Sequence, residues 1–207
     1  MKDLKNSLQQ ISALPATKSE LQFALSAIDL TSLNGFDNQS SISLLCDNAL
    51  KYGTAAVCIY PTFVAQAKKH LSKSEIKVVS VAGAFPHSQL PLSLRLEEIK
   101  YALDEGADEI DMVISRGKLL EGDTAAVYEE ISSAKKICSN KTLKVILETG
   151  ELINSTNIQL AGKIAVDAGA DFLKTSTGKT NVNATPESVY DLLTVIKNSN
   201  KKIGIKW

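Results

Sequence analysis

The sequence predicts an α/β fold of the (β/α)8 TIM-barrel type. Apolar segments of strand length alternate with amphipathic segments of helix length along almost the whole chain, which is typical of a parallel sheet covered by helices. Polar side chains stand at the carboxyl ends of many of these strands. This distribution favours a barrel over an open doubly wound sheet, in which such residues gather near one crevice.

Seven segments have the composition of buried strands. We expect them at residues 27–30, 55–60, 77–81, 109–114, 143–147, 172–174 and 202–206. A closed barrel of this type needs eight strands. The predicted fold is therefore a barrel truncated after its seventh strand, with two strand edges unpaired and open to association.

Helices are expected between the strands. Apolar residues at helical spacing from Ile42 to Leu50 predict a helix that Gly53 ends. Thr185, Pro186 and Glu187 form a good helix start. Further helices are expected through residue 69 and over residues 92–105, 127–138 and 155–168, with an N-terminal helical segment at about 2–26. No linker divides the chain, so one domain is expected over residues 1–207.

Composition excludes several classes of protein. The 23 basic and 23 acidic residues balance, and Arg95 and Arg116 are the two arginines, so a nucleic-acid partner is not expected. Neither a membrane span nor a signal peptide is recognisable in the sequence. Cys46, Cys58 and Cys138 lack metal-ligand spacing and predict reduced thiols, which favours a cytoplasmic protein without membrane association.

Two lysines close apolar segments near the end of the chain. Lys174 ends the sixth expected strand and Lys206 ends the seventh. Neighbouring strands lie about 4.8 Å apart, so the two ammonium groups would disfavour each other's charge and lower the pKa of an amine. A lysine with a lowered pKa can act as a nucleophile. A solvated charge is the usual role of a lone strand-end lysine, and the pairing is what favours a catalytic role.

An internal repeat connects an acid to this site. Residues 106–111 match residues 169–174, so Asp111 and Lys174 should face the same compartment. Asp111 can then keep a lysine protonated or relay protons through a water. Asp29 and Thr31 end the first strand and can bind substrate hydroxyls, although a turn-forming role is equally open.

The polar loop after Lys174 resembles the end of a nucleotide-binding P-loop. Leu173 stands where that motif requires its first glycine, and no helix follows directly, so a Walker motif is rejected. Gly178 and Lys179 can still bind one phosphate. Cys58 is expected in the core, and the role of Glu148 at the end of the fifth strand stays open.

At this point the chain resembles the deoxyribose-phosphate aldolases, class I aldolases with a (β/α)8 barrel. The matching segments occur in family order at residues 28–31, 57–61, 106–111, 147–152, 172–179 and 205–206. The resemblance implies reversible cleavage of 2-deoxy-D-ribose 5-phosphate to acetaldehyde and D-glyceraldehyde 3-phosphate, in deoxyribonucleotide catabolism. It implies no metal or organic cofactor, and a homo-oligomer is possible.

The resemblance also implies roles for individual residues. Lys174 is the Schiff-base lysine, Lys206 depresses its pKa, and Asp111 acts with a water in proton transfer. The phosphate site includes Gly178 and Lys179. The positions around the substrate are Asp29, Thr31 and Thr177.

The chain departs from the family pattern after the second lysine. Family members continue with a glycine-rich phosphate loop, a helix, an eighth strand and a last helix, whereas this sequence stops at Trp207. Three hypotheses follow. The first is an aldolase that is active if complete and impaired in the truncated form, with little activity on the phosphorylated substrate. The second is a catalytically silent remnant that acts at most as a binding or interaction protein, and the third is another class I aldolase of similar architecture.

Overall fold

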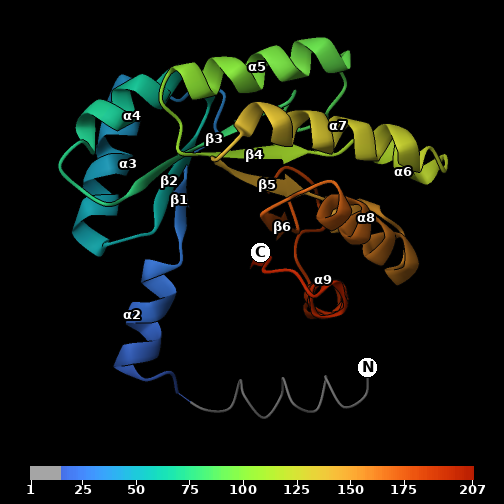
Figure 1. Ribbon diagram of the computed structural model, residues 1–207. Helices are drawn as coiled ribbons and strands as arrows, with labels where there is room; N and C mark the ends of the chain where they lie inside the picture. Colours follow the sequence, from blue (N-terminus) through green and yellow to red (C-terminus); the bar gives the residue numbers. More distant parts are fainter. Residues whose placement is uncertain (1–14) are drawn as a thin grey trace.

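Seven parallel strands form one curled sheet in sequential order, in a computed structural model that describes residues 15–207 (Figure 1). The (β/α)8-type architecture that stops at a seventh strand is therefore confirmed. The strands are β1 (Asp29–Thr31), β2 (Ala56–Ile59), β3 (Lys77–Ala82), β4 (Glu109–Val113), β5 (Thr142–Ile146), β6 (Phe172–Lys174) and β7 (Gly204–Lys206).

Helices cover the outer side of this sheet, except that the first described helix extends away from it below β1 (Figure 1). They are α2 (Lys18–Ser26), α3 (Gln39–Tyr52), α4 (Val64–His70), α5 (Leu92–Asp104), α6 (Arg116–Leu120), α7 (Thr124–Cys138), α8 (Ser155–Asp167) and α9 (Pro186–Ser199), with 3-10 turns η1 (Pro61–Phe63) and η2 (Thr149–Glu151). No helix in residues 15–207 is long and apolar enough to cross a membrane. Of the expected N-terminal helical segment, residues 2–14 lie outside the described part of the chain.

Helix ends follow the capping residues that the sequence offers. Gly53 adopts a left-handed conformation with φ of 65° after α3, where a side chain would be strained. Thr185 caps α9 by accepting a hydrogen bond from the Ser188 amide at 3.1 Å. The first strand begins two residues later than expected because Ala27 still caps α2 with helical backbone angles. The sequence did not predict the short helix α6.

The sheet is well buried in its middle and exposed at its two edges. Every residue of β2 is buried, whereas β1 and β7 have no fully buried residue. Within the described residues, β1 pairs with β2 alone and β7 with β6 alone. α2 buries none of its residues, and its Phe23 is 75% exposed. The sheet is thus an open half-barrel, and the predicted unpaired edges are present.

Candidate active site

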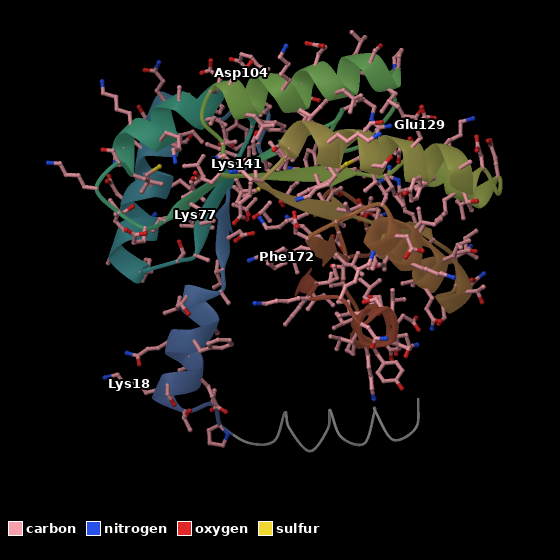
Figure 2. All side chains as sticks on the ribbon, in the orientation of Figure 1. Lys18, Lys77, Asp104, Glu129, Lys141 and Phe172 are labelled. Carbon is pink, nitrogen blue, oxygen red and sulfur yellow. The ribbon has the colours of Figure 1, made fainter. Side chains whose placement is uncertain are left out.

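The candidate site lies toward the carboxyl ends of the strands, as expected for a parallel barrel. Figure 2 labels Lys77, Lys141 and Phe172, which mark the opposite edge, where strands β3, β5 and β6 begin. Strand register pairs Lys174 with Lys206, as predicted, and also pairs Asp111 with Lys144. Because Ile146 of β5 is level with Lys174, the Lys174 and Lys206 pair lies two residues further toward the carboxyl end of the sheet than the Asp111 and Lys144 pair.

Asp111 is the centre of this arrangement. Its carboxylate is fully buried and accepts hydrogen bonds from Lys174 Nζ at 2.5 Å and Lys144 Nζ at 3.2 Å. Burial by itself raises the pKa of Asp111, but the Lys174 and Lys144 ammonium groups outweigh it and hold the pKa below its usual value. Asp111 is therefore an ionised carboxylate, able to accept a proton, in contact with the proposed nucleophile.

Lys144 is a site residue that the sequence reasoning missed. Its side chain is 2% exposed, and its ammonium contacts Asp111, Glu109 and, at 3.4 Å, Asp29 Oδ2. Burial lowers the pKa of Lys144, but the three carboxylates together raise it by more. Asp111 has the largest raising effect, and the net pKa lies above the usual lysine value. The sequence feature that could have identified Lys144 is its position inside the apolar segment 142–146, because a charge buried there needs partners of opposite sign.

Lys174 ends β6 with its ammonium against Asp111. Burial lowers the pKa of Lys174, yet the Asp111 carboxylate raises it more, and the net pKa lies above the ordinary lysine value. The expectation of a depressed pKa for Lys174 is therefore wrong. The nearest charge of opposite sign decides the direction of the shift.

Lys206 does not supply the expected cation beside Lys174. Its ammonium donates to the Ala27 carbonyl at 2.6 Å and pairs with Asp29 Oδ1 at 2.8 Å. The side chain thus reaches from β7 toward β1, across the unpaired edges of the sheet. The neighbouring cation that lowers the pKa of Lys174 is Lys144, and this effect is smaller than that of Asp111.

A cavity of about 460 Å³ opens beside these residues. Asp29, Thr31, Lys174 and Lys206 contribute to its lining, together with Phe23 and Trp207. A space of this size accommodates a small metabolite. Asp29 pairs with the ammonium groups of Lys144 and Lys206, whereas the Thr31 hydroxyl donates to the Asp29 carbonyl of its own strand at 2.8 Å.

No group of three or more His, Cys, Asp or Glu side chains within residues 15–207 is arranged to hold a metal ion.

The loop after β6 carries the other predicted substrate contacts. Gly178 is exposed with φ of 76°, and Lys179 Nζ donates to the Leu33 carbonyl at 2.5 Å, in the loop after β1. Thr177 is buried, and both its amide and its hydroxyl donate to Glu148. Thr177 therefore supports the loop from inside, whereas Gly178 and Lys179 lie on its outer side.

Cys58 lies in the sheet wall, 4.0 Å from Asp111 Oδ2. It is fully buried, and burial, followed by the Asp111 charge, raises its pKa to about 12. The thiol is therefore protonated near neutral pH and weakly nucleophilic. The assignment of Cys58 to the core is confirmed by this burial.

A parallel barrel-type sheet with a buried lysine and carboxylate at its carboxyl end defines the class of α/β-barrel enzymes. Comparison with known proteins narrows this class. The family model described as DeoC/LacD family aldolase matches residues 23–205. The chain therefore belongs to this aldolase family of carbon–carbon lyases.

Relatives and solved structures agree with this assignment. Deoxyribose-phosphate aldolase from Homo sapiens is 42% identical over 226 residues, covering 96% of this chain and 71% of that protein. The Agrobacterium fabrum enzyme of the same name is 44% identical, with coverage of 88% and 71%. Deoxyribose phosphate aldolase from Aeropyrum pernix, described as tetrameric, has a TM-score of 0.78 at 30% identity, with coverage of 89% and 76%. A crystal structure from Coccidioides immitis reaches a TM-score of 0.86 at 28% identity, with coverage of 99% and 83%.

Proposed function

We propose that this aldolase reversibly cleaves 2-deoxy-D-ribose 5-phosphate to acetaldehyde and D-glyceraldehyde 3-phosphate through a Schiff base on Lys174. The observation that carries the proposal is the 2.5 Å contact between Lys174 Nζ and the buried Asp111 carboxylate. This contact places an amine and a proton acceptor together beside the cavity that Lys174 lines. The names of the relatives support the choice of substrate.

In the synthetic direction, the neutral amine of Lys174 attacks the carbonyl carbon of acetaldehyde. Loss of water from the resulting carbinolamine gives an iminium ion, whose positive nitrogen acidifies the neighbouring methyl group. Asp111, directly or through a water, takes one methyl proton and leaves an enamine. The enamine carbon then bonds to the aldehyde carbon of the acceptor, whose oxygen takes up a proton, and hydrolysis of the new iminium frees Lys174.

The first proton transfer sets the pH dependence of this route. Lys174 must lose a proton before it attacks, and Asp111 raises the pKa of its amine. The fraction of neutral amine therefore grows as pH rises toward this raised pKa, by about tenfold per pH unit well below it. Imine formation should accelerate across the same range.

We assign the remaining substrate contacts by their place around the cavity and the loop after β6. Asp29 and Thr31 border the cavity and are proposed to contact sugar hydroxyls. Gly178 and Lys179 are proposed to hold the phosphate, because a glycine turn offers amide donors and lysine a positive charge. Thr177 supports their loop through its hydrogen bond to Glu148. Lys206 also lines the cavity, where its ammonium pairs with Asp29.

Reductive trapping tests the proposed function. The protein is incubated with acetaldehyde and borohydride, and peptide mass mapping locates the added ethyl group. We expect it on Lys174 and expect its loss in Lys174→Met, while Lys163→Met, a change at an exposed lysine on α8, leaves the pattern intact. Modification spread over surface lysines, or unaltered by Lys174→Met, would refute the Schiff-base mechanism.

A second candidate is a family member that keeps the fold but turns over no substrate. The raised pKa of Lys174 and the engagement of Lys206 by Asp29 favour it, since both reduce the supply of reactive amine. The trapping experiment separates the two candidates, because a silent protein leaves Lys174 unmodified.

The proposal extends to the cellular location of the protein and to its oligomeric state. We place the protein in the cytoplasm, on the basis of its three free cysteines, all of them buried. We also propose that it self-associates, because the Aeropyrum pernix enzyme is described as tetrameric. Size-exclusion chromatography with light scattering tests this, and a monomer at all concentrations would contradict it.

A further inference from the structure

Glu148 is a buried acid for which the mechanism above has no use. It lies two residues after the end of β5, and its side chain is fully buried at the start of the turn η2. Its backbone adopts the left-handed conformation with φ of 54°. That region disfavours residues with a Cβ, and such conformations persist where the surroundings hold them, often at functional sites.

The Glu148 carboxylate accepts several hydrogen bonds from the loop after β6. It accepts the Thr177 amide at 3.2 and 3.3 Å, the Thr177 hydroxyl, and the Thr180 hydroxyl at 3.3 Å. Thr177 and Thr180 flank Gly178 and Lys179, the two residues on the outer side of the loop. One buried carboxylate therefore holds both ends of the segment that is proposed to bind phosphate.

Arg116 offsets the charge of Glu148 and shares its Oε2 atom with Thr177. Its guanidinium approaches Glu148 at 3.3 Å from the short helix α6 and pairs with the half-exposed Glu151 at 3.0 Å. A buried carboxylate without a cation would be costly. The ion pair thus allows an acid to lie beneath an anion-binding loop.

The backbone supports the same contact between loops. The Thr149 amide donates to the Thr175 carbonyl at 2.8 Å. A Cβ at Gly150 would lie 2.1 Å from the Val182 carbonyl oxygen, so the two loops approach too closely for any other residue. The turn after β5 therefore packs directly against the loop after β6.

We propose that Glu148 is a positioning residue that holds the 177–180 loop in its phosphate-binding conformation. The proposal rests on the function proposed above and adds a specificity determinant to it. Glu148 acts through Thr177 and Thr180 and touches no reacting atom. Its contribution is to the binding of the phosphorylated substrate and not to the chemistry at Lys174.

The test compares two substrates in two matched variants. Glu148→Gln keeps the side-chain size but replaces one acceptor oxygen by an amide that cannot accept. Glu151→Gln is the matched control: it makes the same chemical change at the other carboxylate that pairs with Arg116 and leaves the contacts of Glu148 with the loop in place. KM and kcat are measured for 2-deoxy-D-ribose 5-phosphate and for unphosphorylated 2-deoxy-D-ribose, and the affinity for inorganic phosphate is measured by titration calorimetry.

For Glu148→Gln we expect KM for the phosphorylated sugar to rise roughly tenfold, with kcat changed far less, and phosphate affinity to fall by a similar factor. Glu151→Gln should alter either quantity less than about twofold, as for an exposed ion pair. Equal losses on both sugars, or unchanged phosphate affinity, would overturn the proposal.

Two further measurements keep these outcomes apart. If Glu148→Gln fails to fold, Thr180→Val removes one loop donor and should show a smaller loss of phosphate affinity in the same direction; no loss would again overturn the proposal. Acetaldehyde trapping at Lys174 in the wild-type protein tests the proposed function separately. Trapping with an unchanged phosphate affinity in Glu148→Gln refutes the role of Glu148 alone, whereas absent trapping refutes the Schiff base alone.

Discussion

The middle of the sheet and its two edges hold their charged residues in different ways. In the middle, Asp111 and Lys144 come from neighbouring strands that are paired on both sides, and both side chains are buried. At the edges, Asp29 and Lys206 come from strands paired on one side only, and the Lys206 side chain reaches toward β1. The first arrangement follows from strand register and the second depends on where one long side chain points.

This difference assigns unequal roles to the two lysines near Lys174. Lys144 has three carboxylate partners and little freedom to move, so its charge is a permanent part of the site. Lys206 is partly exposed, and its ammonium is bound by Asp29 and a backbone carbonyl. The electrostatics of Lys174 are therefore set by the middle of the sheet.

Removing Lys144 should have the largest effect on stability. Lys144→Met leaves Asp111 and Glu109 without their shared buried cation, and we expect a loss of roughly 3–5 kcal/mol in the free energy of unfolding at pH 7. Urea unfolding measures it. Lys206→Met, at the edge, should cost no more than about 1 kcal/mol; similar costs for both variants would remove the distinction between middle and edge.

The same variant has a pH signature. The folded-state pKa of Lys144 is raised above the ordinary value of 10.5. The stability that its charge contributes is therefore fully present below pH 10.5 and is lost as pH rises through the raised pKa. Lys144→Met should lack this part of the alkaline loss, and an identical alkaline decline in both proteins would contradict the assignment.

Asp111→Asn should separate proton transfer from imine formation. The amide keeps the shape but removes the proton acceptor, so exchange of the acetaldehyde methyl protons with solvent should slow by roughly a hundredfold or more. NMR in deuterated buffer measures this rate, with reductive trapping at Lys174 as the control. Normal exchange in a variant that still forms the imine would assign Asp111 a structural role.

Apolar packing should also contribute more to stability in the middle of the sheet than at its edge. Leu143 in β5 is fully buried, whereas Ile205 in β7 is partly exposed. Leu143→Ala should cost about 3 kcal/mol of unfolding free energy, and Ile205→Ala about 1 kcal/mol, because an edge site loses less contact and relaxes more readily. Equal costs in urea unfolding would mean that the edge strand is as well packed as the middle.

Sequence reasoning predicted the parts of the fold and site that depend on periodicity. Strand–helix alternation gave the parallel architecture, and the repeat placed Asp111 and Lys174 in one compartment, where they are in contact. Lys144 was not predicted, because the carboxylates that offset its buried charge lie on other strands, at least 33 residues earlier in the chain. The short helix α6 was also missed, since its five residues show little periodicity.

The direction of a side chain lies beyond such patterns. Register correctly paired Lys174 with Lys206, but register does not determine where a flexible ammonium finds its partner. Lys206 pairs with Asp29, and Asp111 reverses the expected sign of the Lys174 pKa shift. Likewise, the contacts of Glu148 depend on a loop 29 residues later in the chain.

The pH dependence of borohydride trapping at Lys174 tests most directly whether the middle of the sheet controls its reactivity. The midpoint is compared among the wild-type protein, Asp111→Asn and Lys206→Leu. Because Asp111 raises the pKa of Lys174, its replacement should shift the midpoint to lower pH, by about one unit or more, whereas Lys206→Leu should leave it nearly unchanged. A midpoint that rises in Lys206→Leu and stays constant in Asp111→Asn would contradict the account.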